Sequence, residues 1–321
     1  MPTPSVLAGS PLLWTVLVAV ALVLVGLAAG RFNGRLVPLF GPARPPRAQG
    51  GRGAAASHGA PPAAGHDEAG AEPGTAAHTL HRLPPTDEDD DEGPPPPRCP
   101  HCLAELRFVP GFSAVAVRPL RRRGACPHCE QVIRSHPAVI AVTALLFGLV
   151  GAVSTLRPDP SPFGLLAVLW LVSVGVLLSV IDLRVLRLPD AVVAPAYPVA
   201  AVLVGASVLL PPSGPDLERA GGALSSMVFV TVLYWLLWRV HRGGIGFGDV
   251  KLSGLTGLYA GWAAGPLGAL AAVFWAFAAF SLVGVVLLVL RRITRRDPFP
   301  LGPFMLAATL ATVLAGAPLL P

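Results

Sequence analysis

Long apolar runs alternate with short, arginine-bearing links, and this alternation constrains the chain more than any other feature. Nearly every run is close to the roughly 20 residues that an α-helix needs to cross a hydrocarbon layer of about 30 Å. Of the 321 residues, 53% are hydrophobic and only 13% are charged. That balance is typical of a polytopic membrane protein rather than of a large soluble domain.

Eight candidate spans follow from these runs. The run Leu252–Leu290 is too long for one helix, so we divide it at the Gly-Trp-Ala-Ala-Gly-Pro segment in its middle. The predicted spans are Leu12–Ala29, Ala138–Leu156, Phe163–Ile181, Ala191–Leu210, Gly221–Val240, Lys251–Ala263, Pro266–Leu290 and Leu301–Leu320. We therefore expect an all-α, polytopic membrane helix bundle of about eight transmembrane helices. The first run lacks the charged n-region of a signal peptide, so we treat it as a true span.

The basic residues predict the orientation. Of the 24 Lys and Arg residues, all but Arg157 and Arg219 fall in the long first loop, the third and fifth loops, the loop after the seventh span, or the adjoining span ends. These four loops share one side of the membrane if the spans alternate, and basic loops mark the cytosolic side. We predict a multi-pass protein of the plasma (inner) membrane with its N-terminus outside. The positive charge is explained by this orientation, so we expect no nucleic-acid partner.

Composition divides the chain into four parts. Residues 1–30 hold the first transmembrane helix, and residues 98–137 hold all the cysteines. Residues 31–97 are predicted to be a disordered cytosolic tether, because they are rich in Pro, Gly and Ala and carry a solvated acidic run at Asp87–Glu92. Residues 138–321 form the membrane core.

The cysteines predict a metal site. They form two Cys-Pro-His-Cys segments made up of Cys99, Cys102, Cys126 and Cys129. Two Cys-x-x-Cys hairpins can present four thiolates tetrahedrally to one Zn²⁺, and a closed site of this kind is structural. Disulfides are the alternative, but they rarely persist in the cytosol. His101 and His128 are alternative ligands. We predict a small, zinc-knuckle-like segment on the cytosolic side.

Two aspartates border apolar runs, where a charge is costly unless the protein uses it. Asp182 ends the third span, and Asp249 opens the sixth within Gly246-Phe247-Gly248-Asp249-Val250-Lys251. The paired glycines allow a sharp turn and the close approach of another chain. Gly254, Gly257 and Gly261 give the following helix a small-residue face for close packing. Neighbouring spans could thus bring the two carboxylates together.

Each acidic residue also has a simpler interpretation. Asp182 could pair with Arg184 or Arg187, although it lies at a helix C-terminus, where the helix dipole disfavours an anion. Asp190 follows Pro189 and is expected to cap the fourth span. Asp249 could be a cap as well, with Lys251 as a snorkelling anchor.

A carboxylate pair is suited to proteolysis. Two close carboxylates share a proton, so the ionised one can take a proton from water while the neutral one donates to the scissile carbonyl. Such chemistry needs no metal and no covalent intermediate. The membrane core offers no serine or cysteine nucleophile with a base beside it.

Four motifs in order resemble those of the prepilin peptidases, or type IV leader peptidases, of the GxGD class of membrane aspartic proteases. They are residues 121–137 with the second cysteine pair, Ile181-Asp182 through Leu188-Pro189-Asp190, Gly246 through Leu252, and Leu301-Gly302-Pro303-Phe304. The resemblance covers most of the chain outside the tether. It implies Asp182 and Asp249 as the catalytic pair, with Gly246, Gly248, Lys251 and Asp190 as supporting motif residues.

The resemblance also implies a substrate. Such enzymes remove the short basic leader of pilin or pseudopilin precursors at the cytosolic membrane face. Many also N-methylate the new N-terminus from S-adenosylmethionine, and a cysteine segment accompanies that form. Here Gly30-Arg31-Phe32-Asn33 departs from the family's pattern and the tether is unusually long, so the sequence leaves the methylation open. It does not name the particular pilin or the oligomeric state.

Two other classes of function compete with a peptidase. A proton-coupled transporter would also use intramembrane aspartates, but these lie at one membrane face rather than at the midplane, and no inverted repeat is evident. A zinc-bearing membrane scaffold without chemistry is the other class. Leader cleavage by the purified protein separates the three.

Overall fold

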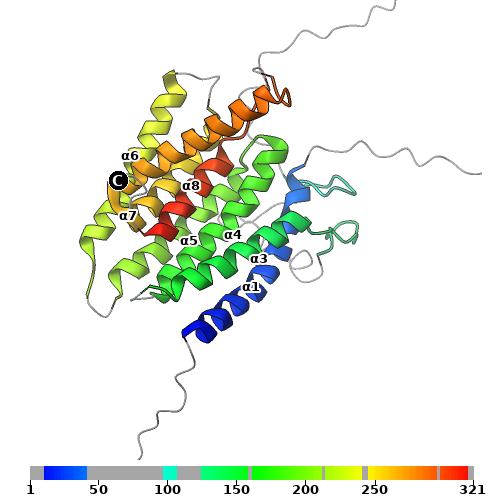
Figure 1. Cartoon of the computed structure of the whole chain (residues 1–321). Helices are drawn as coiled ribbons and strands as arrows, with labels where there is room; N and C mark the ends of the chain where they lie inside the picture. Colours follow the sequence, from blue (N-terminus) through cyan, green and yellow to red (C-terminus); the bar gives the residue numbers. More distant parts are fainter. Residues whose placement is uncertain are drawn as a thin grey trace, which may run out of the picture. The chain divides into compact units, whose positions relative to one another are not determined.

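The structure is a computed structural model that describes residues 11–41, 97–106, 124–157, 161–211, 214–240, 245–294 and 297–316. Most of the predicted tether lies outside these ranges. The helices run α1 (Pro11–Leu36), η1 (Val37–Phe40), α3 (Pro137–Ser154), α4 (Pro162–Val185), α5 (Asp190–Leu209), α6 (Leu217–Val240), α7 (Phe247–Val289) and α8 (Gly302–Ala315). Within the described ranges the only β-structure is two isolated bridges in the cysteine segment. The predicted all-α fold is confirmed (Figure 1).

α7 is a helix that folds back on itself. Its backbone leaves helical geometry at Ala264 and Gly265, where Gly265 has a φ of +67° and Pro266 follows. Thr256 lines the same small cavity as Ala276, although a straight helix would separate them by about 30 Å. The two halves of α7 therefore face each other, which agrees with our division of the run Leu252–Leu290 into two spans.

The number of membrane crossings is only partly settled by helix lengths. Among the described residues, six helices are long and apolar enough to cross a membrane, and one of them is the folded-back α7. α8 has 14 residues, or about 21 Å, and is shorter than the predicted span Leu301–Leu320. The chain is a multi-pass membrane protein, and the count of eight spans stays a prediction.

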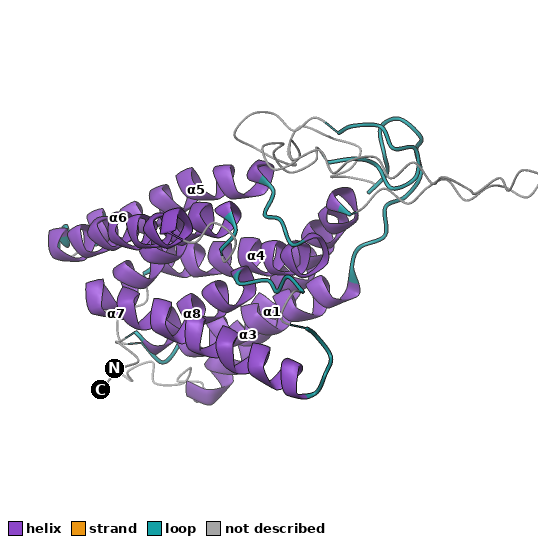
Figure 2. Ribbon diagram, turned by 90° about the horizontal axis from the view of Figure 1, so that it is seen from above, coloured by secondary structure: helices purple, strands orange, loops and turns teal. Residues whose placement is uncertain are grey.

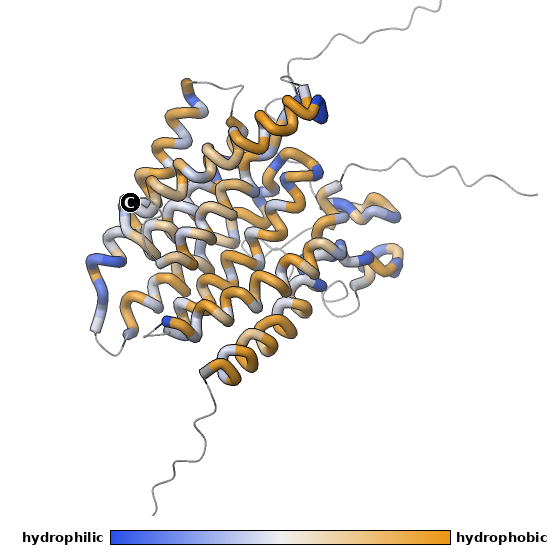
Figure 3. The backbone as a smooth tube through the Cα atoms, in the orientation of Figure 1, coloured by the Kyte–Doolittle hydropathy of each residue, from blue (hydrophilic) through white to orange (hydrophobic). Residues whose placement is uncertain are grey.

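The helices lie side by side, and hydrophilic residues are concentrated near their ends (Figures 2 and 3). At one end of the bundle, two arginines form hydrogen bonds between neighbouring helices. Arg157, after α3, donates to the carbonyl oxygens of Val313 and Leu314 at the end of α8. Arg219, at the start of α6, donates to the carbonyl of Trp262 beside the α7 bend. These two are the basic residues that the orientation rule set apart from the rest.

α1 extends further than predicted, from Pro11 to Leu36 rather than to Ala29. Three glycines at a spacing of four let it lie against α3. A side chain added at Gly26, Gly30 or Gly34 would come within 2.8 to 3.0 Å of α3 or of the residue before it. Beyond the apolar run, Asn33 is buried and donates to the carbonyl and hydroxyl of Ser173 in α4. This contact explains why the helix continues past the predicted span.

Candidate active site

Asp182 lies in the last turn of α4, whose two ends are well defined. The hydroxyl of Ser161 caps the start by accepting from the Gly164 N–H, and Pro162 occupies the first turn. Leu186 ends the helix in the left-handed region with a φ of 56°, and its N–H donates to the Asp182 carbonyl. Asp182 is only 5% exposed, so its carboxylate is enclosed by the bundle rather than by water.

Asp249 lies in the first turn of α7. The N-cap of this helix is Gly246, so the alternative that Asp249 itself is the N-cap is wrong. Asp249 is the third helical residue, and its carboxylate lies beside Gly246, where an added side chain would be 3.4 Å from Oδ2. A short acidic side chain at this position can reach back to the cap residue, as in a capping box. The carboxylate is nevertheless buried, with 9% exposure.

The fold brings the two aspartates to the same end of the bundle. A side chain added at Gly302, at the start of α8, would lie 2.7 Å from Asp182 Oδ2 and 3.7 Å from Leu252, three residues after Asp249. Leu188, in the link after α4, lies against the start of α7, where a side chain added at Gly248 would come within 3.1 Å of it. The predicted convergence of the two motifs is therefore what the structure contains.

The supporting residues Lys251 and Asp190 bond to each other. The Lys251 ammonium lies 2.7 Å from both carboxylate oxygens of Asp190 and joins α7 to α5. Our interpretation of Asp190 as a helix cap is wrong: the N-cap is Pro189, and Asp190 is the first residue of α5. As the first helical residue, Asp190 directs its carboxylate to the Lys251 ammonium and not to a backbone N–H of its own helix.

Asp182 does not pair with the nearby arginines. The salt bridges between described residues join Lys251 to Asp190 and Arg98 to Glu105, and neither involves Asp182, Arg184 or Arg187. One Asp182 oxygen, Oδ2, is buried with no hydrogen-bond partner among the described residues. A buried, unsatisfied carboxylate oxygen is costly, so it is more typical of a functional group than of a structural one.

A third segment completes the site and was not recognised as part of it from the sequence. Gly302, in the first turn of α8, lies directly against the Asp182 carboxylate. A side chain added at Gly302 would lie 2.7 Å from Asp182 Oδ2. In the sequence, Leu301-Gly302-Pro303-Phe304 stands out only through its resemblance to a family motif. The signal available was a glycine at the opening of an apolar run, which alone could not indicate its partner.

The four cysteines form one compact cluster. Each Cys-Pro-His-Cys segment folds into a tight turn closed by a β-bridge, and the backbone N–H of its histidine faces the first cysteine sulfur. All four thiols are free, so the disulfide alternative is not what the structure contains. Their sulfur atoms lie within 4.8 Å of one another, whereas His101 and His128 are outside the group.

The cluster fits a tetrahedral metal. The sulfurs of Cys99 and Cys129 are 3.8 Å apart, as are those of Cys102 and Cys126. Four sulfurs at 2.3 Å from one zinc would be separated by about 3.8 Å, while a disulfide needs about 2 Å. Cys99 and Cys126 are buried, and the segment is attached to η1 by a hydrogen bond from Arg98 N to the Leu39 carbonyl. The four cysteines could therefore bind a metal.

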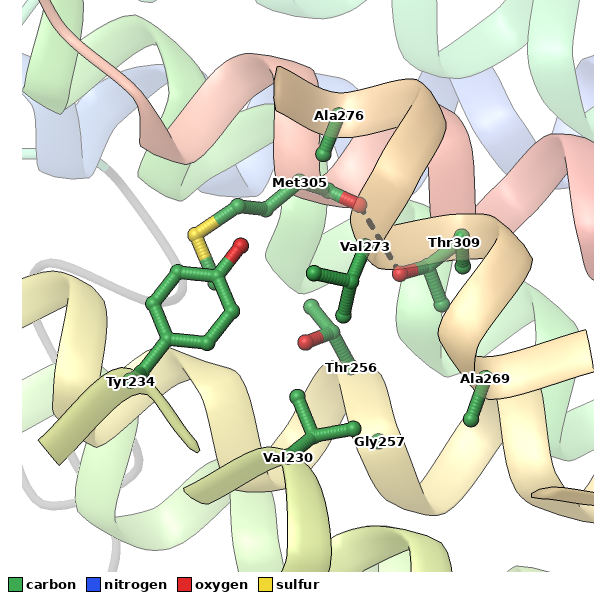
Figure 4. Close-up of a pocket in the computed structure, with 10 residues that line it drawn as sticks. Val230, Tyr234, Thr256, Gly257, Ala269, Val273, Ala276, Met305 and Thr309 are labelled. Carbon is green, nitrogen blue, oxygen red and sulfur yellow. Dashed lines mark hydrogen bonds between the residues drawn. The ribbon is translucent and has the colours of Figure 1, made fainter. Parts of the chain in front are cut away.

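A separate small cavity lies between α6, α8 and the two halves of α7 (Figure 4). Its volume is about 10 Å³, which is at the lower limit for one water molecule. Thr309 lines it and donates its hydroxyl proton to the Met305 carbonyl. Neither Asp182 nor Asp249 belongs to its lining. The cavity is a packing space and not the candidate active site.

Comparisons with known proteins agree with this geometry. The family model described as the type IV leader peptidase family matches residues 165–289, a range that contains both aspartates. A protein of Burkholderia pseudomallei (strain 1026b) named prepilin leader peptidase/N-methyltransferase is 32% identical over 228 residues, covering 68% of this chain and 67% of that protein. An Aeromonas hydrophila protein of the same name is 31% identical over 226 residues, covering 68% and 71%. No solved structure matches the chain. This chain belongs to the type IV leader peptidase family.

Proposed function

We propose that this protein is a membrane aspartic endopeptidase that cleaves the leader of type IV prepilin or pseudopilin precursors, with Asp182 and Asp249 as its catalytic pair. One observation carries the proposal: two buried aspartates, from the end of α4 and the start of α7, lie at the same end of the bundle, where the segments that hold them pack against each other. Membership of the family supports the reaction, and residues 138–321 would form the peptidase core.

The reaction needs one ionised and one neutral carboxylic acid. The ionised carboxylate removes a proton from water, and the resulting oxygen attacks the scissile carbonyl carbon. The neutral acid donates its proton to the carbonyl oxygen, which gives a neutral tetrahedral intermediate. When this intermediate collapses, the C–N bond breaks, the departing amine takes up the proton of one carboxylic acid, and the other carboxylate takes up a proton from a hydroxyl of the intermediate. The pair then returns to its initial state with one shared proton.

The orientation of the bundle suits a leader substrate. With the N-terminus outside, the links that flank the two aspartates lie in the cytosol, where the basic leader of a precursor resides before cleavage. The substrate's apolar segment would remain in the inner membrane beside the bundle. The expected partners are therefore the precursors themselves and the lipid bilayer.

Leader cleavage by purified protein in detergent tests the assignment of the catalytic pair. Asp182→Asn and Asp249→Asn should each lower kcat by about 10²- to 10⁴-fold, because each removes a proton-transfer group and leaves the shape unchanged. Asp297→Asn is the matched control: this exposed aspartate accepts from the Thr294 N–H and should tolerate the change. Cleavage retained by Asp182→Asn or Asp249→Asn would remove that residue from the pair.

The N-methyl transfer in the relatives' printed name is a second candidate activity. S-adenosylmethionine would be its methyl donor, and the four-cysteine segment is the feature of this chain that favours it. The cleavage assay can include S-adenosylmethionine. The mass of the released N-terminal peptide then shows whether one methyl group has been added.

We also propose a structural zinc ion at Cys99, Cys102, Cys126 and Cys129. All four positions of a tetrahedral metal would be taken by sulfur, so the site would stabilise the segment without binding water. The purified protein should contain about one zinc per chain, and the double variant Cys99→Ser/Cys126→Ser should contain almost none. Wild-type protein that is free of metal and has four reactive thiols would contradict the proposal.

A further inference from the structure

Tyr197 connects α5 to the backbone of α7 just after Asp249. Its hydroxyl donates to the carbonyl of Lys251 and accepts from the N–H of Leu255, with an N–O distance of 3.0 Å for the second bond. In a regular helix this carbonyl and this N–H are paired with each other. The hydroxyl therefore bonds both members of one helical hydrogen-bond pair, which fixes the position of that turn more closely than side-chain packing does.

A glycine makes this contact possible. A side chain added at Gly254 would lie 2.5 Å from the Tyr197 hydroxyl oxygen and 2.8 Å from Thr231 Oγ1. Any other residue at 254 would displace the hydroxyl from the helix backbone. The sequence suggested that Gly254 serves close helix packing, and the structure gives it a more specific role: it makes room for one hydroxyl of α5.

The fixed turn directly follows the candidate catalytic aspartate. Asp249 lies two residues before Lys251, whose side chain is also bonded to α5 through Asp190. That ion pair is 36% and 51% exposed at its two side chains, so by itself it contributes little to rigidity. The hydrogen bonds of Tyr197 are less exposed to water than this ion pair, which also joins α5 to the start of α7.

α5 is in turn attached to the helix that carries Asp182. The indole N–H of Trp170 in α4 donates to the carbonyl of Ala196, the residue before Tyr197. Pro195 and Pro198 lie on either side in α5 and restrict its backbone. Hydrogen bonds thus run from α4 through α5 to the first turns of α7.

We infer that Tyr197 is a positioning residue: by fixing the first turns of α7 along and about the helix axis, it keeps Asp249 facing Asp182. The inference rests on the proposed function, because it assigns these aspartates as the catalytic pair. A displacement of about 1 Å in a catalytic group is enough to cost on the order of 100-fold in rate. Loss of the hydroxyl should therefore act on the chemical step more than on substrate binding.

Two matched variants test the inference. Tyr197→Phe should lower kcat roughly 10- to 100-fold and change KM by less than about threefold. Tyr259→Phe is the control, because it removes a fully buried hydroxyl of α7 that donates to the Ala167 carbonyl, away from the aspartates. Its kcat should stay within about twofold of wild type.

Hydrogen exchange gives a readout that does not depend on cleavage. In Tyr197→Phe, the peptide covering residues 249–255 should exchange faster than in wild type, whereas Tyr259→Phe should leave it unchanged. If Tyr197→Phe fails to fold, Gly254→Ala serves instead, since its added methyl group displaces the hydroxyl from the helix.

The outcomes separate the inference from the proposed function. If the wild-type protein cleaves and Tyr197→Phe matches Tyr259→Phe in both kcat and exchange, the inference is wrong and the proposed function stands. If the wild-type protein cleaves no leader, the proposed function fails, and exchange at residues 249–255 still shows whether Tyr197 anchors the turn. A lower kcat together with faster exchange in Tyr197→Phe alone supports the inference.

Discussion

At the scale of single residues, Gly302 shows how the absence of a side chain shapes the site. A methyl group added at this position would lie 2.7 Å from Asp182 Oδ2. Gly302→Ala should therefore push the carboxylate away from Asp249 and lower kcat about 10- to 100-fold, measured as leader cleavage. The free energy of unfolding should fall by only about 1 to 3 kcal/mol, because a short side chain can move aside.

The control for Gly302→Ala is Gly284→Ala, since a methyl group added at Gly284 meets no atom within 4 Å. This variant should cleave like wild type. Equal activity of the two variants would show that Asp182 tolerates displacement, and it would weaken the proposed geometry of the pair.

At the scale of elements, the close contact of α6 with the first half of α7 depends on glycines. A side chain added at Gly261 would overlap the side chain of Ser226, and one added at Gly257 would lie 2.7 Å from the Ser226 carbonyl oxygen. Gly261→Val should force the two helices apart and lower the free energy of unfolding by about 1 to 3 kcal/mol. Thermal unfolding in detergent measures this loss.

Gly205→Val is the control at this scale, because Gly205 lies in α5 with open space around its α-carbon. It should change the unfolding temperature very little. If both valine variants were equally stable, the small-residue face of α7 would not be what holds α6 in place.

At the scale of the whole molecule, the bundle has two chemically different ends. One end holds the aspartates, and the other holds Arg157 and Arg219, which bond to backbone carbonyls. We predict that the aspartate end faces the cytosol. A membrane-impermeant maleimide added to intact cells should label Leu156→Cys, whose native side chain is 78% exposed, but should label Arg187→Cys only after permeabilisation.

Wild-type protein provides the background for this labelling, because it carries the same four cysteines in the cysteine segment. The reverse pattern, with position 187 labelled in intact cells, would invert the orientation. It would also separate the aspartates from a cytosolic leader, so the proposed substrate would have to be abandoned.

Much of the fold could be predicted from composition and length. The apolar runs correspond to helices, and Gly265-Pro266 marks the bend of α7 because glycine accepts a positive φ and proline cannot continue the preceding helical hydrogen bonds. The cysteine cluster could also be predicted, since two Cys-x-x-Cys turns have few ways to satisfy four thiols. The true end of α1 was missed because the buried bond from Asn33 to Ser173 joins segments far apart in sequence.

The site was predictable only in outline. The order of the runs places Asp182 and Asp249 at one end of the bundle, but it does not give the rotation of each helix. These helices are apolar on nearly every face, so no polar stripe indicates which side meets which neighbour. The pairing of Asp190 with Lys251 and the contact of Gly302 with Asp182 both depend on that rotation.

The sequence by itself determined that the chain crosses a membrane several times, where its helices bend, and that two acidic side chains share an end with most of the positive charge. These properties follow from the cost of placing charges and unpaired backbone groups in hydrocarbon, which each segment meets on its own. Only the tertiary structure decided which groups surround Asp182 and Asp249. Gly302 of α8 lies against Asp182 and Tyr197 of α5 bonds the turn after Asp249, and both contacts depend on glycines that matter only once the helices have packed.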